Sequence, residues 1–177
     1  MSDTTALQCT CGHTRLEVTG APIMTTECCC TSCRAAGSRM QALEGAPDFL
    51  SRYGTPFVMY RKDRVRFITG EEALKAFRLS PKAPTRRAVA TCCNTPIFLE
   101  FQSGHWLSLY REIWPAGARP AIEQRTMTVD LPNGVELPDD IPNPKKHTFT
   151  FFVKLLGAWV AMGFRVPKIV VSEELDA

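Results

Sequence analysis

The apolar and polar residues in the first two thirds of the chain alternate over short runs, which is the pattern of half-buried β-strands. The first runs cover residues 13–18 and 23–28, and a Gly-Ala-Pro break separates them. Further runs, separated by charged or glycine-containing turns, lie at 57–60, 65–68, 73–79, 87–91, 98–101 and 106–110. Several short strands at close spacing predict a mainly β protein with twisted antiparallel sheets.

Two stretches interrupt this alternation. Residues 34–43 follow a cysteine-rich run and end before Pro47, so we expect a short helix or turn there. Residues 115–144 are rich in proline and predict a loop.

A third stretch, residues 148–164, is almost entirely apolar, with Lys154 as its only charge. It is shorter than the roughly 20 residues of a membrane-spanning helix and carries a central lysine, so we expect no membrane span. The pattern favours a helix that is buried in the fold or lies at the interface of a homodimer, with Lys154 at its polar edge.

The composition suits one globular domain, because the 177 residues are 45% apolar and 22% charged. We expect residues 1–114 to form a β domain, which contains all eight cysteines. Residues 115–177 should add the loop, the apolar helix and a tail packed on the same domain. The formal net charge of +3 does not favour a nucleic-acid partner, because bound thiolates would offset it and no basic stripe is interleaved with aromatic residues.

The most informative residues are eight cysteines in three groups. In extended backbone, successive side chains point to opposite faces, so Cys28 and Cys30 share a face while Cys29 points away. Cys33 then closes a turn back toward that pair. Three converging thiolates hold a soft divalent ion, and the tetrahedral preference of zinc leaves a fourth position open.

The other two groups lie on either side of this cluster along the chain. Cys9 and Cys11 alternate in the same way and should point together, with Gly12 freeing the backbone after them. Cys92 and Cys93 are adjacent and precede Asn94, which tolerates the left-handed conformation that a metal knuckle commonly needs past its last thiol. The three groups can be divided between two ions in more than one way.

The first six residues contain neither a basic region nor an apolar stretch, so they do not predict secretion. We therefore expect a cytoplasmic, reducing environment, in which grouped cysteines are more often metal ligands than disulfides. In the remaining redox interpretation, Cys29 pairs with a liganded neighbour on oxidation and the metal is released.

The motifs resemble the glutathione-dependent formaldehyde-activating enzyme family, in a superfamily that also contains centromere protein V-like proteins. The family pattern is C-x-C-G, C-x-C-x-x-C-R and C-x-x-C-G-T-P. This chain has Cys9-Thr10-Cys11-Gly12, then Cys28-Cys29-Cys30-Thr31-Ser32-Cys33-Arg34, then Cys93-Asn94-Thr95-Pro96. The resemblance covers about residues 7–101, and the details are closer to a bacterial branch of the superfamily than to the enzyme itself.

The resemblance implies coiled antiparallel sheets with a rubredoxin-like zinc knuckle, an Mss4-like fold, and two Zn²⁺ ions per chain. Cys9, Cys11 and Cys93 fall on the positions of a structural zinc. Cys28, Cys30 and Cys33 fall on the positions of a catalytic one, and the physical logic agrees. A closed tetrahedral site ties distant strands together, whereas a three-ligand site stays open.

The chain departs from the family at Ala90, which replaces the first cysteine of the final C-x-x-C. We expect Cys92 to substitute as the fourth structural ligand, although adjacent thiols reach one ion only if the backbone bends sharply between them. The alternative is a buried Cys92 thiol, with water or His13 completing the site. Cys29 is expected to be a packed thiol.

The function that the resemblance implies is thiol capture by a carbon-sulfur lyase. The open zinc would bind glutathione or another small thiol as thiolate, for reaction with a small aldehyde such as formaldehyde. Arg34 matches a family position and is the first candidate to bind substrate carboxylates, with Arg39, Arg86 and Arg87 behind it. The competing hypothesis is a non-enzymatic, zinc-stabilised binding module.

Overall fold

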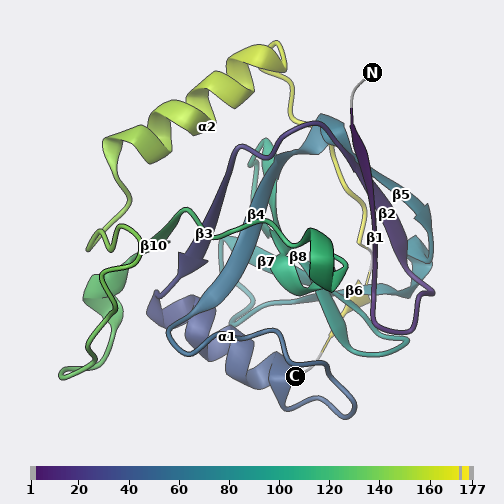
Figure 1. The fold of residues 1–177 in the computed structure, drawn as a ribbon. Coiled ribbons are helices and arrows are strands. Elements are labelled where there is room, and N and C mark those ends of the chain that lie inside the picture. The colour runs from purple at the N-terminus through teal and green to yellow at the C-terminus, as the bar shows by residue number, and fades with distance from the viewer. Residues whose placement is uncertain (1–2, 172, 176–177) are drawn as a thin grey trace.

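The computed structural model describes residues 3–171 and 173–175, in which the chain forms two sheets and two α-helices (Figure 1). The smaller sheet is antiparallel, in the order β1-β2-β5. Its strands are β1 (Thr4–Gln8), β2 (Arg15–Thr19) and β5 (Val65–Thr69). These strands confirm the expected alternation in the N-terminal region.

The larger sheet has the strand order β10-β3-β4-β9-β8-β7-β6-β11. Its strands are β3 (Met24–Cys28), β4 (Thr55–Arg61), β6 (Leu74–Phe77), β7 (Thr85–Ala90), β8 (Thr95–Phe101), β9 (Trp106–Tyr110), β10 (Gln124–Thr126) and β11 (Glu173–Glu174). The mainly β prediction is therefore confirmed.

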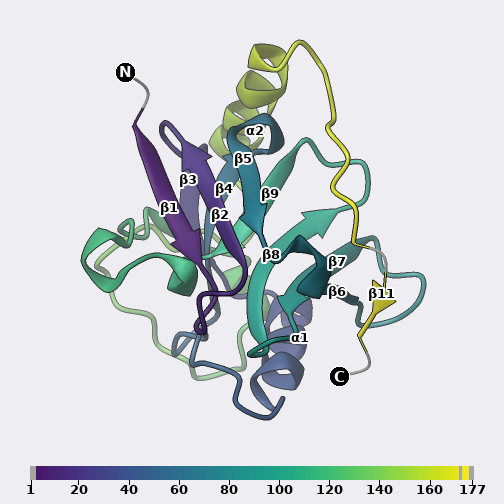
Figure 2. The ribbon, with the colours of Figure 1, turned by 90° about the vertical axis from the view of Figure 1, so that its right-hand side faces the viewer.

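The C-terminal third supplies both edge strands of this sheet, which the sequence did not indicate. β10 pairs with β3 and β11 pairs with β6, in both cases in parallel, whereas the inner pairs are antiparallel. The expectation of a plain loop over residues 115–144 was therefore wrong at β10. Figure 2 shows β1 and β11 on opposite sides of the molecule.

Five short 3-10 helices also occur in the described residues. They are η1 (Lys62–Arg64), η2 (Glu71–Ala73), η3 (Arg111–Ile113), η4 (Ala116–Ala118) and η5 (Thr128–Asp130).

Both faces of the larger sheet are covered, which explains why β4 is buried along almost its whole length. Successive residues of a strand face opposite sides. Val58 packs in the core shared with the smaller sheet, together with Leu16 and Leu109. Phe57 packs on the other side against Met40 of the first helix.

The first helix, α1 (Thr31–Gln41), begins earlier than the expected segment 34–43. The reason is local, because the Sγ atom of Cys30 accepts a hydrogen bond from the Cys33 amide at 3.3 Å and caps the helix. Cysteine is not a common capping residue, so the sequence pattern did not place the start here.

The second helix, α2 (Phe149–Ala161), lies across the end of the molecule away from α1 (Figure 1). Thr148 caps it by accepting a hydrogen bond from the Phe151 amide at 3.2 Å. Phe151 and Leu155 are its buried residues, whereas the Phe149 side is solvent-exposed, with Phe149 itself 84% exposed. The expectation of a helix buried in the fold therefore holds for one edge only. No helix in the described part of the chain has both the length and the apolar character needed to cross a membrane.

Candidate metal centres

The first candidate centre joins the two sheets through four cysteines. Cys9 and Cys11 lie in the turn that follows β1, and Cys92 and Cys93 lie in the turn between β7 and β8. Their four Sγ atoms all lie within 4.8 Å of one another. The chain thus brings together ligands that are far apart in sequence, as a structural metal site requires.

The sulfur positions match a tetrahedral ion. The Sγ–Sγ distances are 3.6 Å for Cys9–Cys11, 3.8 Å for Cys9–Cys92, 3.4 Å for Cys11–Cys92 and 3.9 Å for Cys92–Cys93. A tetrahedron with metal–sulfur bonds of about 2.3 Å has sulfur–sulfur edges of about 3.8 Å. These four residues could therefore hold one metal ion.

The adjacent Cys92 and Cys93 converge because they do not lie in a strand. Residues 91–94 form a turn, and Asn94 adopts a left-handed backbone with φ of 51°. A turn of this kind is needed if Cys92 is to replace the family cysteine that is absent at position 90, where this chain has Ala90. The Asn94 side chain also donates a hydrogen bond to the Glu44 carbonyl at 3.0 Å, which anchors the turn.

Neighbouring polar groups favour a thiolate at Cys93 of this centre, whereas burial raises the pKa of Cys9 and of Cys92. The Thr14 amide donates to Cys9 Sγ at 3.3 Å, and the Thr95 hydroxyl lies 3.0 Å from Cys93 Sγ. Burial raises the pKa of Cys93, but the bonds from Thr95 and Cys11 outweigh it and lower the pKa to about 6. His13 lies outside the group, because its Nε2 atom pairs with Glu72 at 3.1 Å.

The second candidate centre is formed by Cys28, Cys30 and Cys33, whose Sγ atoms also lie within 4.8 Å of one another. Cys28 ends β3, Cys30 caps α1, and Cys33 lies in the first turn of α1. A strand end followed at once by a helix start therefore turns all three thiols to one side. Three ligands leave a tetrahedral ion with one open position.

The pKa values of the three thiols differ, because the thiols hydrogen-bond to one another. Hydrogen bonds from Cys28 and Cys33 lower the pKa of Cys30, whose Sγ also accepts from the helix amide and lies 3.2 Å from the Ser32 hydroxyl. The same bond to Cys30 raises the pKa of Cys28 to about 11. Cys30 is thus the first thiolate of the group, held at a helix N-terminus where negative charge is favoured.

Cys29 points away from this centre, as the alternation predicts. It is fully buried, and its Sγ lies 3.8 Å from the Glu27 carbonyl oxygen. Burial raises the pKa of its thiol to about 12, so it is a packed, protonated thiol.

The three-cysteine centre opens into a cavity of about 290 Å³ that Cys28, Cys30 and Cys33 all line. Most of the other walls are apolar, with contributions from the larger sheet and from α2. The apolar walls are Phe57, Met59, Leu99, Phe101, Trp106, Phe151, Phe152 and Leu155, and hydroxyl groups line the cavity at Thr26, Ser32, Thr85, Ser108 and Thr126. The apolar C-terminal helix thus covers the site, a role that its sequence alone did not reveal.

Two basic side chains also line this cavity. Arg87 is only 1% exposed and has no carboxylate partner among the described residues. Its hydrogen bonds to Thr85 Oγ1 and the Ser32 carbonyl are long, at 3.4 and 3.5 Å, and it also interacts with the Tyr110 hydroxyl. His147 stacks on Phe151 with ring centroids 4.2 Å apart, and its buried Nδ1 has no hydrogen-bond partner in the described part of the chain. His147 was missed in the sequence, although it is one of only three histidines and directly precedes the cap of α2.

Arg34 binds backbone carbonyl groups outside the cavity. Its Nε and Nη2 atoms donate to the backbone carbonyls of Cys29 and Asp130 at 3.2 and 2.7 Å, and it does not line the cavity. Arg86 pairs with Glu100 and also donates to the Ile169 carbonyl. Of the four arginines considered from the sequence, Arg87 is thus the one that lines the cavity.

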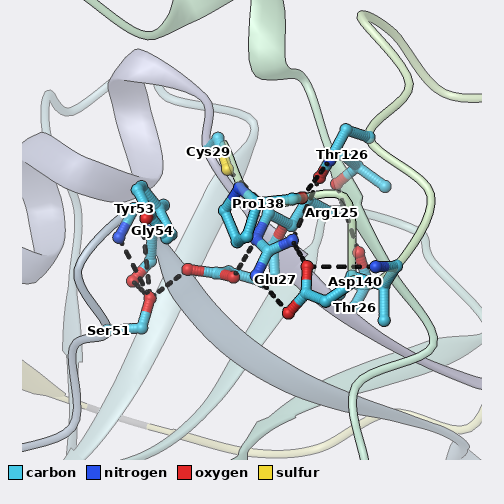
Figure 3. A network of polar contacts seen from close by, with 12 residues as sticks. Thr26, Glu27, Cys29, Ser51, Tyr53, Gly54, Arg125, Thr126, Pro138 and Asp140 are labelled. Atoms are coloured by element: carbon cyan, nitrogen blue, oxygen red, sulfur yellow. Dashed lines mark hydrogen bonds and ion pairs between the residues drawn. The ribbon is translucent and has the colours of Figure 1, made fainter. Parts of the chain in front are cut away.

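A buried polar network beside Cys28 fastens the C-terminal segment to β3 (Figure 3). Glu27 Oε2 accepts from Arg125 Nε of β10 at 3.0 Å, and Ser51 donates to the other oxygen of Glu27. Arg125 also pairs with Asp140 at 2.7 Å and lies over the Tyr53 ring. The network therefore holds in place the chain that leads to His147 and α2.

The close packing around Cys28 gives a direct prediction for Gly54. A methyl group at this position would lie 2.3 Å from the Cys28 carbonyl oxygen and 3.1 Å from the Cys29 Cα atom. Because both are backbone atoms, Gly54→Ala must displace the end of β3, at a cost of about 1–3 kcal/mol. If each candidate centre holds an ion, we expect the variant to lose that of the three-cysteine centre to a chelator while it retains that of the four-cysteine centre.

Gly117→Ala is the matched control, because no heavy atom lies within 4 Å of the added methyl group. It should retain both ions in the same chelator titration. Equal metal retention in Gly54→Ala and Gly117→Ala would show that the end of β3 does not position the three thiols.

No protein-family model matches the chain, and no curated protein matches it. Among solved structures, a Rhodobacter sphaeroides protein is similar, with 16% sequence identity and a TM-score of 0.45. The match covers 78% of this chain and 99% of that protein. A similarity of this size carries no argument about function.

Proposed function

We propose that this chain is a two-zinc protein of the formaldehyde-activating superfamily with a rubredoxin-like knuckle. In this proposal Cys9, Cys11, Cys92 and Cys93 hold a structural zinc. Cys28, Cys30 and Cys33 hold a second zinc that captures a small thiol for reaction with a small aldehyde. The observation that carries the proposal is the opening of the three converging thiols into a cavity of about 290 Å³, away from the four-cysteine centre.

The proposed reaction is the addition of a thiol to an aldehyde, or its reverse. The sulfur–hydrogen bond of the thiol breaks, a carbon–sulfur bond forms at the aldehyde carbon, and the carbonyl oxygen takes a proton, so that one product contains all the atoms. When bound, zinc supplies the positive charge that favours a captured thiolate. The protein contributes three fixed thiolates, apolar walls that exclude water, and an unpartnered His147 nitrogen inside the cavity.

Cobalt(II) in place of zinc tests capture directly, because thiolate binding to cobalt changes its absorption spectrum. We expect at least one thiol from a panel of glutathione, 2-mercaptoethanol and benzyl mercaptan to change the spectrum of the native protein. Cys30→Ser should abolish the response, whereas Cys29→Ser should retain it, because Cys29 points away from the centre. A silent native protein, or a response that survives in Cys30→Ser, would contradict thiol capture.

The second candidate is a zinc-stabilised binding module, and one observation favours it. The side of α2 that does not line the cavity is strongly apolar, with Phe149 84%, Leu156 54% and Val160 52% exposed. Under this candidate both ions are structural, and loss of the three-cysteine ion would not change a chemical activity. The cobalt titration separates the two candidates.

A further inference from the structure

The walls of the three-cysteine cavity point to the class of molecule that enters it. We propose that the cavity takes a small ligand with an apolar, uncharged body of about aromatic size, and that glutathione is not its co-substrate. This inference rests on the proposed function for the role of the thiol, but the apolar selectivity is a property of the cavity itself.

The volume of the cavity suits a small ligand. A cavity of about 290 Å³ lies at the lower end of the range, about 300–1,000 Å³, that holds drug-sized ligands. A benzyl-sized body fits within it beside a metal-bound sulfur. Glutathione is a tripeptide, so it would fill a cavity of this size much more completely than a benzyl group.

The apolar walls of the cavity disfavour a charged ligand. Phe57 and Leu99 come from the sheet, and Phe151 and Leu155 come from α2, so apolar surface faces the ligand from both sides. Glutathione carries two carboxylates and an ammonium group at neutral pH. Burial of those charges against apolar walls is costly unless each one finds a partner.

The charges of a metal centre and of Arg87 also bear on the ligand. A divalent ion with three thiolates carries one net negative charge, and Arg87 brings one buried positive charge to the same cavity. Metal centre and guanidinium therefore neutralise each other before any ligand enters. A captured thiolate adds one negative charge to this sum. An uncharged apolar body adds none beyond it, whereas the carboxylates of a charged body would add more buried negative charge.

The ligand preference is tested on the metal-loaded native protein. Titrations of the cobalt-loaded protein, followed by absorption, compare the affinities of benzyl mercaptan, 2-mercaptoethanol and glutathione. Calorimetry measures the affinity of benzyl alcohol, which has the apolar ring but no thiol. Burial of the ring should make benzyl mercaptan about 10-fold tighter than either other thiol, or more. Benzyl alcohol should bind, with saturation, at one site.

Two phenylalanines on α2 provide a matched pair of variants. Phe152 and Phe149 are both solvent-exposed, so neither substitution should prevent folding, but only Phe152 lines the cavity. Phe152→Ala should weaken benzyl mercaptan binding about 3- to 10-fold, whereas Phe149→Ala should leave it unchanged within about 2-fold.

The outcomes distinguish this inference from the proposed function. Glutathione binding at least as tightly as benzyl mercaptan would overturn the inference while leaving thiol capture intact. Equal effects of the two phenylalanine variants would also overturn it. If no thiol changed the cobalt spectrum but benzyl alcohol bound and was weakened by Phe152→Ala, thiol capture would fail and the apolar cavity would stand.

Discussion

Replacement of Cys9 by serine is expected to leave the chain largely unfolded, which is the largest effect predicted for any single substitution here. Cys9 is buried at 1% exposure, and its centre joins the β1–β2 turn to the β7–β8 turn. Structural zinc contributes about 10–16 kcal/mol in small zinc domains, which equals or exceeds the whole stability of an ordinary domain, about 5–15 kcal/mol. If the four-cysteine centre holds a structural ion, its loss should therefore separate the two sheets.

The measurement is near-ultraviolet circular dichroism together with metal content, on protein purified without added metal. Cys29→Ser is the control, because it removes an equally buried thiol that does not point to either centre. It should fold and retain both ions. A folded Cys9→Ser protein with an unchanged melting temperature would show that the four-cysteine centre is not structural.

The second large effect is expected at Arg125. Removal of one partner from a buried ion pair leaves an uncompensated charge, at a cost of about 3–5 kcal/mol. In Arg125→Met the uncompensated charge is the Glu27 carboxylate, because the Glu27 side chain is only 6% exposed. Glu27 directly precedes Cys28 of the three-cysteine centre. We therefore expect the free energy of unfolding, measured by chemical denaturation with metal present, to fall by about this amount.

Two variants give this prediction its controls. Arg66→Met removes one partner of an exposed pair with Glu17, in which the Arg66 side chain is 74% exposed, and should cost at most about 1 kcal/mol. Addition of Glu27→Gln to Arg125→Met removes the stranded charge and should restore part of the loss. If Arg125→Met were no more destabilising than Arg66→Met, the network in Figure 3 would not anchor the C-terminal segment.

The cysteine groups were predictable from sequence because their geometry is local. Alternation in extended backbone places Cys28 and Cys30 together and Cys29 apart, and the structure keeps this arrangement. The approach of Cys92 to Cys9 cannot be read from alternation in the same way, because it depends on a bend at residues 91–94. Asn94 indicates a left-handed residue just after the last thiol, and it does adopt positive φ.

The closure of the cavity was not predictable, because it depends on contacts between distant segments. β10 is a short polar run, Gln124–Thr126, that has no strand pattern of its own. It becomes a strand because it pairs with β3, and because Arg125 finds the buried Glu27. Likewise, the periodicity of residues 148–164 indicates an apolar helix but does not say which face meets the cavity.

The metal content per chain tests the central claim most directly. It should be measured on protein purified without added metal, for the native chain, Cys30→Ser and Cys92→Ser. Two zinc ions in the native chain, one in a folded Cys30→Ser protein, and an unfolded Cys92→Ser protein would establish an open centre beside a structural one. One ion or none in the native chain, or the loss of both ions from Cys30→Ser, would contradict this division.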